Sequence, residues 1–401
     1  MNGQHLLTIN TGSSSLKAAL YRVGATETRL LAAQAERIGL PGSRLRLEDF
    51  RGDTLYERRD ALPDHPAALR TLLDRLRIQG WDRGLAAVGH RVVHGGDRYS
   101  EPRLIDAELN ESLRRLTAVD PEHMPQALAT IEATARTYPT VPQVACFDTA
   151  FHRRMPAVAR LYALPRRFAE AGVLRYGFHG LSCEYVMEEL RAADPEKADG
   201  RVLIAHLGNG ASLTAVRGGV GVDTTMGFTP TGGLVMGTRS GDLDPGVLIH
   251  LLRSPESDPS VLGDLVNREA GLLGVSGTSA DMRDLLACEE DDPRAAEAID
   301  LFCYQAKKFL GALAAALGGL DTLVFTGGIG EHAAPVRWRI CEGLAFLGIQ
   351  LDQDRNATHA PVISQEDGAV TVRVVRTDEN QMIARHTHRL TTQKGATNVS
   401  F

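Results

Sequence analysis

Three glycine-rich segments of the sequence could hold phosphate groups through their backbone amides. They span 10–17, 207–212 and 326–331, and each follows an apolar run. Glycine lets a backbone N–H approach a phosphate oxygen closely, and in the first segment three serine hydroxyls and Lys17 add donors and charge. Each segment, taken alone, is equally consistent with an ordinary tight turn. No GxxxxGK[ST] motif is present, which excludes a P-loop.

Two arginines, Arg91 and Arg239, lie among glycines and polar residues rather than on predicted helix faces. A guanidinium group matches the planar fork of a carboxylate or the oxygens of a phosphoryl group in transfer. The alternative is a structural ion pair with Asp97 or Asp242, two carboxylates nearby in the sequence. The residues themselves leave this choice open.

A histidine and two carboxylates complete the set of candidate chemical groups. His179 is flanked by glycines before a predicted helix, where it could donate a hydrogen bond to an anion. Asp148 and Glu379 each follow a predicted strand, and their oxygens suit Mg2+. The alternatives are a structural histidine and carboxylates that cap or begin a helix. The other histidines lack HExxH spacing, so zinc-dependent hydrolysis is not indicated.

The elements that must position these residues alternate between strands and helices, which is typical of an α/β protein. The predicted strands are 6–10, 16–23, 28–38, 44–47, 85–93, 144–147, 202–207, 212–216, 323–326 and 370–376. The predicted helices are 65–78, 107–118, 125–138, 183–192, 246–252, 261–269, 282–288, 294–317, 336–347 and a last one that ends near 388. The polar tail after Leu390 is expected to be loosely structured.

The two halves of the chain open in the same way. A strand, a glycine-rich turn and a returning strand occur at 6–23 and again at 202–216. Aligning Ser15 with Ser212 gives an offset of 197 (212 − 15 = 197), close to half of the 401 residues. An internal duplication would explain the match, and coincidence is the alternative because few residues are compared.

Length and composition restrict the class of protein. A chain of 401 residues exceeds the usual size of one hydrophobic core, so two domains are expected. The net charge of −6 gives no support to binding of nucleic acid or a membrane surface. Five scattered cysteines without a CxxC pair indicate reduced thiols, and no apolar run reaches 18 residues. A cytoplasmic location is therefore expected.

Eight ordered sequence runs resemble the acetate and propionate kinases. The runs are NTGSSSLK, GHRVVHGG, FDTAFH, RYGFHG, HLGNGAS, GTRSGDLDPG, FTGGIGE and TDEN, and together they span nearly the whole chain. This family is similar to sugar kinases, heat-shock chaperone ATPases and actin. The resemblance implies an α/β fold of two duplicated actin-like, ribonuclease-H-like domains with a nucleotide cleft between them. The implied domains are 1–148 plus 381–401, closed by the C-terminal helix, and 149–380, which would carry most of the nucleotide site.

The resemblance also implies roles for individual residues. The implied catalytic residues are Asp148, Arg91, Arg239, His179 and His123. The implied nucleotide-binding residues are Asn10, Ser13, Ser15, Lys17, His206, Gly208, Asn209, Gly210, Asp281, Met282, Arg283, Gly327, Gly328, Ile329, Gly330 and Glu331. The implied residues around the carboxylate substrate are Arg91, Val93, Phe178 and Pro230. Asn10 and Glu379 would be linked to the metal.

The implied reaction is transfer of a phosphoryl group between ATP or ADP and acetate or another short-chain carboxylate, with acetyl phosphate as the product and Mg2+ or Mn2+ as the metal. A carboxylate is ionised near neutral pH, so it needs no general base. The resemblance also implies a homodimer. The alternatives are a propionate or butyrate kinase and a non-catalytic, nucleotide-driven clamp.

This chain departs from the family pattern at several positions. Glu122 precedes His123, where the family has an apolar residue, and this leaves the choice of acid open. Further departures occur at Leu181, Cys183, Met282 and His332.

Overall fold

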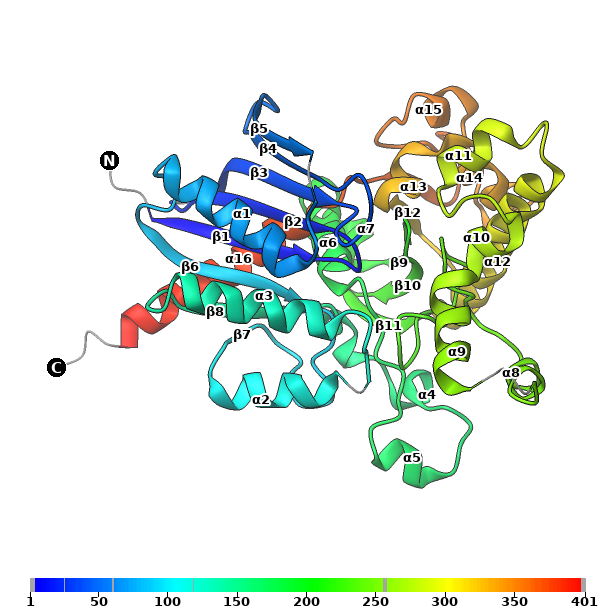
Figure 1. Ribbon diagram of the computed structural model, residues 1–401. Coiled ribbons are helices and arrows are strands. Elements are labelled where there is room, and N and C mark those ends of the chain that lie inside the picture. Colours follow the sequence, from blue (N-terminus) through cyan, green and yellow to red (C-terminus); the bar gives the residue numbers. More distant parts are fainter. Residues whose placement is uncertain (1–3, 25, 60, 118, 255–257, 398–401) are drawn as a thin grey trace. The chain divides into compact units, whose positions relative to one another are not determined.

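The computed structural model describes residues 4–24, 26–59, 61–117, 119–254 and 258–397 (Figure 1). Its contacts divide the chain into two compact units. Unit 1 comprises Met1–Ala150 and Asp378–Phe401, and unit 2 comprises Phe151–Thr377. The sequence predicts divisions after residues 148 and 380, and the contacts place them after Ala150 and Thr377.

Unit 1 is built on one eight-stranded sheet with the order β5-β4-β3-β2-β1-β6-β8-β7. The strands are β1 (His5–Thr11), β2 (Leu16–Arg22), β3 (Thr28–Glu36), β4 (Arg44–Asp49), β5 (Thr54–Arg59), β6 (Leu85–Val92), β7 (Arg103–Leu104) and β8 (Gln143–Phe147). The helices are α1 (His65–Ile78), α2 (Ala107–Leu116), α3 (Met124–Thr137) and α16 (Glu379–Thr397). Strands β1 to β5 form an antiparallel meander, whereas β6 and β8 run parallel to β1.

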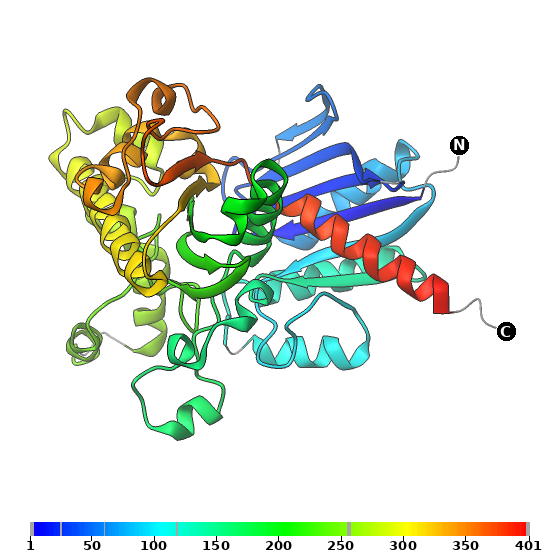
Figure 2. The ribbon, with the colours of Figure 1, turned by 180° about the vertical axis from the view of Figure 1, so that it is seen from behind.

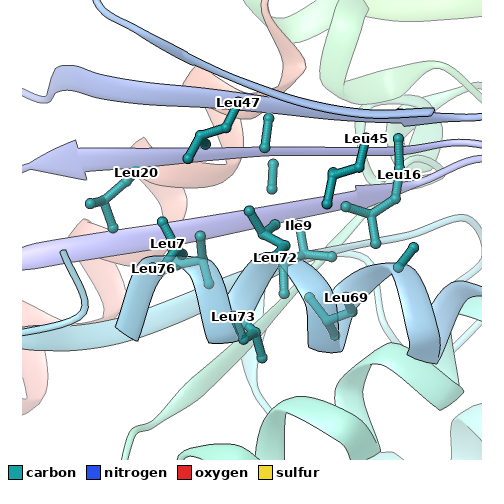
Figure 3. Close-up of a cluster of buried hydrophobic side chains, with 14 of the residues drawn as sticks. Leu7, Ile9, Leu16, Leu20, Leu45, Leu47, Leu69, Leu72, Leu73 and Leu76 are labelled. Atoms are coloured by element: carbon teal, nitrogen blue, oxygen red, sulfur yellow. The ribbon is translucent and has the colours of Figure 1, made fainter. Parts of the chain in front are cut away.

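Helices cover both faces of this sheet. Helices α1 and α3 pack on one face (Figure 1), and α16 lies across the other (Figure 2). In α1, leucines repeat at helical spacing and meet leucines of β1, β2 and β4 in a buried cluster (Figure 3). On the other face, Gly89 of β6 lets α16 approach closely, because a Cβ there would lie 2.2 Å from Thr387 Oγ1.

Unit 2 is built on a five-stranded sheet with the order β11-β10-β9-β12-β13. The strands are β9 (Arg201–Leu207), β10 (Ala211–Arg217), β11 (Val220–Thr224), β12 (Thr322–Thr326) and β13 (Thr371–Val374). The helices are α4 (Ala157–Arg160), α5 (Arg166–Glu170), α6 (Gly180–Ala193), α7 (Pro195–Asp199), α8 (Pro245–Leu251), α9 (Pro259–Asp264), α10 (Gly271–Ser276), α11 (Met282–Cys288), α12 (Pro293–Leu317), α13 (Gly327–His332), α14 (Ala334–Cys341) and α15 (Gln353–Ala357). Short helical turns occur at Ala150–Arg154, Leu265–Glu269 and Ala345–Leu347.

The two sheets repeat one topology. In unit 2, β11, β10 and β9 are antiparallel, and β12 and β13 continue parallel to β9. Unit 1 has the same sequence of pairings in β3, β2, β1, β6 and β8. The shared order supports the duplication that the offset of 197 residues predicts. In unit 2, α6 packs on the sheet through a buried apolar cluster, and α12 contacts β9, β10 and β11.

Several elements differ from the sequence prediction. The segment at 327–331, predicted as a glycine-rich turn, is the body of helix α13. The helix predicted at 336–347 ends at Cys341, because Gly343 follows with a φ of 77°, in the left-handed region that favours glycine. Helix α16 continues through Thr397, so the tail predicted to be loose is helical to that point. Strands β5, β7 and β11 have no counterpart among the predicted strands.

Candidate active site

An ion pair in unit 1 joins Arg91 to Asp148. Arg91 lies near the end of β6, and Asp148 follows β8, its parallel neighbour, so both side chains reach the same edge of the sheet. Both Nε and Nη2 of Arg91 donate to Asp148 Oδ2, at 2.9 and 2.5 Å. Nη1 donates to Thr11 O at 3.0 Å and weakly to Asn10 Oδ1 at 3.4 Å. The partner of Arg91 is therefore Asp148, and not Asp97 as the structural alternative supposed.

The electrostatics of this pair reflect burial. Burial lowers the pKa of Arg91, but the carboxylates of Asp148 and Glu379 outweigh it, so the pKa is raised overall and the guanidinium is always charged. Burial raises the pKa of Asp148, and Arg91 opposes that rise. Asp148 Oδ1 is buried and has no hydrogen-bond partner within the described part of the chain. One oxygen of this carboxylate thus holds Arg91, and the other is available to a further ligand.

Asn10 and Glu379 lie together although 369 residues separate them. Asn10 Nδ2 donates to Glu379 Oε2 at 2.7 Å, and Thr8 Oγ1 donates to Asn380 Oδ1 at 3.1 Å. These two bonds attach the first turn of α16 to β1. The structure thereby brings together two residues that the family resemblance links to a metal.

His123 precedes α3 and is oriented by Asp120. His123 Nδ1 lies 3.0 Å from Asp120 Oδ1, and both side chains are buried. An ionised carboxylate only accepts hydrogen bonds, so Nδ1 carries a proton. Asp120 is not among the predicted site residues, because its contact with His123 forms only once the turn before α3 is folded.

The first glycine-rich turn, between β1 and β2, is closed by a hydrogen bond from Gly12 N to Ser15 O at 2.8 Å. His65 Nε2, at the start of α1, donates to Gly12 O at 2.9 Å and so attaches the turn to α1. The side chains of Ser13 and Lys17 are exposed. The turn therefore presents a hydroxyl and an ammonium group to solvent, as a phosphate site requires.

In unit 2, His179 and His206 form a stacked pair. Their ring centroids are 4.1 Å apart and the planes differ by 20°. His179 caps α6 with a φ of 58°, in the left-handed region, and its Nδ1 lies 2.9 Å from Ser212 Oγ. His206 Nδ1 lies 2.8 Å from Ser182 Oγ. Each ring thus contacts one serine hydroxyl, and the sequence does not predict either contact.

Gly210 brings His179 and Arg239 together. A Cβ at Gly210 would lie 3.2 Å from His179 Nε2 and 3.6 Å from Arg239 Nη1. Arg239 Nη1 also donates to Pro230 O at 3.2 Å. Asp242, the structural alternative as its partner, accepts a hydrogen bond from Gly233 N instead, at 2.7 Å. Two cationic or hydrogen-donating side chains therefore meet beside a residue with no side chain of its own.

The remaining glycine-rich segments of unit 2 lie side by side. Strand β12 runs parallel to β9, and a Cβ at Gly208 would lie 3.8 Å from Gly328 N. Gly327 has a φ of 76°, and a Cβ there would meet Leu207 O at 2.7 Å, so only glycine fits. Its N–H donates to Glu331 Oε1 at 3.0 Å. The Glu331 side chain thus closes the first turn of α13 rather than extending into solvent.

The other predicted contacts vary in exposure. Asp281 caps α11, and its ion pair with Arg283, at 2.6 Å, lowers the pKa of the Asp281 carboxyl. Arg283 is 88% exposed, whereas Met282 is buried. The three predicted apolar residues of the substrate site, Val93, Phe178 and Pro230, are all buried.

Asn209, Gly330 and Ile329 complete the predicted set. Asn209 O accepts a hydrogen bond from Gly237 N at 3.0 Å, which ties the β9–β10 turn to the loop that carries Arg239. Gly330 and Ile329 lie within α13.

Within the described ranges, no group of three or more His, Cys, Asp or Glu side chains could hold a metal ion by itself. Among the same residues, no helix combines the length and apolar character needed to cross a membrane.

Comparisons with known proteins identify the family of this chain. Residues 5–385 match the acetokinase family. A relative named acetate kinase, from Rhodopseudomonas palustris, is 48% identical over 393 residues, which cover 96% of this chain and 98% of the relative. The crystal structure of Porphyromonas gingivalis acetate kinase has a TM-score of 0.86 at 38% identity, covering 96% of this chain and 99% of that one. A propionate kinase from Francisella tularensis has a TM-score of 0.89 at 34% identity, with the same coverage.

Proposed function

The chain belongs to the acetokinase family, and we propose that it transfers the terminal phosphoryl group of ATP to acetate, forming acetyl phosphate and ADP, and catalyses the reverse reaction. The observation that carries the proposal is the meeting of His179 Nε2 and Arg239 Nη1 beside Gly210. This arrangement offers two donors to the oxygens of one phosphoryl group, which gathers negative charge as it is transferred.

The roles in unit 1 follow from the ion pair. Arg91 would bind the acetate carboxylate or the transferring group, and Asp148 would hold its guanidinium in place through two hydrogen bonds. Asp120 would hold the ring of His123 in one orientation through its contact with Nδ1. The chemistry needs no general base, because acetate is already ionised, so these side chains would contribute alignment and charge neutralisation.

The nucleotide would be held by backbone amides and a few side chains. In unit 1 these are Asn10, Ser13, Ser15 and Lys17. In unit 2 they are His206, Gly208, Asn209 and Gly210, and around the adenosine Asp281, Met282, Arg283 and Gly327 through Glu331. Val93, Phe178 and Pro230 would surround the acetate methyl group, since all three are apolar and buried.

A divalent ion fits the donors that unit 1 provides. Glu379, Asn10 and Asp148 offer carboxylate and amide oxygens, and Asp148 Oδ1 is buried without a partner within the described residues. Mg2+ commonly takes one or two carboxylates and completes its shell with water and substrate phosphates. Mg2+ or Mn2+ bound here would neutralise phosphate charge. The side chains of this chain would only hold and orient it.

A homodimer and a cytoplasmic location complete the proposal. Apolar side chains are exposed on the segment of α4 and α5, at Val158 and Leu164, and on α8, at Val247 and Ile249. If these side chains adjoin one another, they would form the kind of apolar patch that marks a protein interface. The five cysteines, all within the described residues, form no disulfide, which suits a reducing compartment. Light scattering after size exclusion is expected to give twice the 43.3 kDa chain mass, and the chain mass alone would contradict the dimer.

The assay for the function measures the ATP formed from acetyl phosphate and ADP with Mg2+. A coupled reaction that depends on the ATP produces the dye signal. Arg239→Ala is expected to lower kcat by about 10³- to 10⁵-fold, as loss of a phosphoryl-binding arginine does. Arg253→Ala, which removes an exposed arginine of the same unit, is the matched control and should be unaffected. Near-normal turnover of Arg239→Ala would refute its role.

Propionate is the second candidate substrate, because the propionate kinase structure matches this chain as well as the acetate kinase does. One methylene in an apolar pocket changes selectivity by only about 1–3 kcal/mol. The two acids are therefore to be compared by kcat/KM.

A further inference from the structure

A chain of hydrogen bonds leads from Glu331 to the ring of His206. Glu331 Oε1 accepts from Thr377 N at 3.2 Å. Ser182 Oγ donates to Thr377 Oγ1 at 2.9 Å, and the same Ser182 oxygen lies 2.8 Å from His206 Nδ1. Ser182 is fully buried in the first turn of α6, so no water competes for its hydroxyl.

The proton count of this chain determines the state of the imidazole. A serine hydroxyl has one hydrogen, and that of Ser182 is used by Thr377. The oxygen of Ser182 can then only accept from His206, so Nδ1 of the ring must carry a proton. In the neutral ring Nε2 is consequently a lone pair and not a donor.

We propose that Ser182 and Thr377 are positioning residues that fix the neutral tautomer of His206 with its proton on Nδ1. The second part of the proposal rests on the proposed function, in which His206 meets the nucleotide phosphates. Phosphate oxygens only accept hydrogen bonds, so an Nε2 lone pair would repel them. His206 therefore binds the nucleotide as an imidazolium, and nucleotide binding takes up a proton.

The groups around His206 are compatible with one positive charge. Its paired residues on the neighbouring strands are Ser212 of β10 and Thr326 of β12, which are uncharged. The charged group on the α13 side is Glu331, reached through Thr377. Glu331 Oε2 also lies 3.9 Å from Arg376 Nε and 3.8 Å from His332 Nε2, so its charge is shared with these two groups. The remaining negative charge favours a cationic ring on His206.

Two groups oppose a second charge nearby. His179 stacks on His206 at 4.1 Å, and Arg239 Nη1 lies beside Gly210 together with His179. Two stacked imidazolium rings would repel each other. The proton taken up with the nucleotide is therefore expected on only one of the two rings. That ring is His206, because its neutral form carries its proton on Nδ1 and must gain a second proton on Nε2 to bind phosphate.

The first experiment reads the tautomer directly in the nucleotide-free enzyme. With ¹⁵N-labelled histidine at pH 8, the spectra of the wild type are expected to show Nδ1 of His206 protonated and Nε2 bare, with the signal assigned by its loss in His206→Asn. Thr377→Val removes the acceptor of the Ser182 proton but keeps the backbone N–H. That proton can then turn to Nδ1, so the ring proton is expected to move to Nε2.

Ser182→Ala tests the chain from its middle. It removes the acceptor for Nδ1–H, so a mixture of both tautomers is expected, and Ser182→Thr should restore the wild-type pattern. Thr214→Val, which deletes another buried hydroxyl of unit 2 bonded to Thr224, is the control that should leave His206 unchanged. An Nε2–H ring in the wild type, or no change in both Thr377→Val and Ser182→Ala, overturns the proposal.

The second experiment measures proton uptake when MgADP binds. Calorimetric titration at pH 8, in buffers of different ionisation enthalpy, is expected to show uptake of about one proton by the wild type. In Thr377→Val the neutral ring already donates from Nε2, so uptake should fall toward zero. Binding without uptake by the wild type overturns the imidazolium. No MgADP binding at all would instead refute the proposed function, and the tautomer measurement would still decide the first part.

Discussion

Each member of the buried Arg91–Asp148 pair is expected to need the other for the stability of unit 1, and a double-mutant cycle can measure this dependence. Arg91→Met leaves the Asp148 carboxylate buried without its cation, and Asp148→Leu leaves the guanidinium buried without its anion. Removing one partner of a buried ion pair costs about 3–5 kcal/mol. The Asp148 side chain is fully buried and that of Arg91 is 14% exposed, so solvent cannot replace the lost partner.

The double variant should be far less destabilised than the sum of the two changes. It buries no charge, and apolar residues in place of a buried pair are often neutral or stabilising. We expect a coupling free energy of about 3 kcal/mol, at the upper end for residues in contact.

The assay is urea unfolding followed by tryptophan fluorescence. The chain has two tryptophans, Trp81 in unit 1 and Trp338 in unit 2. Trp81 packs against the buried leucine cluster of unit 1, so a Trp338→Phe background reports that unit alone. Changes that add without coupling, or a cost below about 1 kcal/mol for Asp148→Leu, would refute the reasoning.

A pH series provides an independent check of the same pair. Burial raises the pKa of Asp148, and Arg91 opposes the rise, so Arg91→Met should raise this pKa further. A carboxyl whose pKa is higher in the folded state stabilises that state below its unfolded pKa and loses this contribution as pH rises through the folded pKa. Arg91→Met should therefore be less destabilising at pH 5 than at pH 8.

Three further outcomes are expected. Gly210→Ala should lower kcat/KM by at least about 10-fold at unchanged melting temperature, because its Cβ fills the space beside two phosphate donors. The control Gly311→Ala, in open space on α12, should stabilise the protein by about 0.5–1 kcal/mol. Equal activity of the two variants would contradict the site. Burial lowers the pKa of His90 and of His152 to about 4, so each neutral ring should lose about 3 kcal/mol of stabilisation as pH falls from about 6.5 to about 4. A glutamine at either position should therefore reduce the pH dependence of the stability measured by urea unfolding. An unchanged pH dependence would show that these histidines do not cause the loss. Arg337→Met should lower the free energy of unfolding by about 3 kcal/mol or more, because the buried guanidinium donates to backbone carbonyls of α13. A loss near zero would show that the carbonyls find other partners.

Much of the framework could be predicted because it depends on local patterns. The α1 prediction at 65–78 is confirmed residue for residue, since Asp64 caps the helix and leucines repeat at its period. The β1–β2 and β9–β10 hairpins are likewise confirmed. Strand β5 was missed because its residues are mostly exposed and lack apolar alternation.

The parts that could not be predicted depend on tertiary contacts. Gly327, Gly328 and Gly330 disfavour a helix, yet α13 forms because Arg337 binds the carbonyls at its end. Ser182 has no distinguishing neighbours in the sequence, and only the fold places its hydroxyl between Thr377 and His206. The site residues predicted on strand ends meet as clusters within each unit, and their catalytic roles stay predictions.

The most direct test of the proposed function is hydroxylamine trapping of the acyl phosphate formed with ATP and Mg2+. Formate, acetate, propionate and butyrate are to be compared, with Arg239→Ala as the inactive control and Arg253→Ala as the active one. Acetate is expected to give acetyl hydroxamate with the highest kcat/KM, and propionate should follow. The absence of trapped product with every acid, from an enzyme that binds MgADP, would contradict a carboxylate kinase and favour a non-catalytic nucleotide clamp.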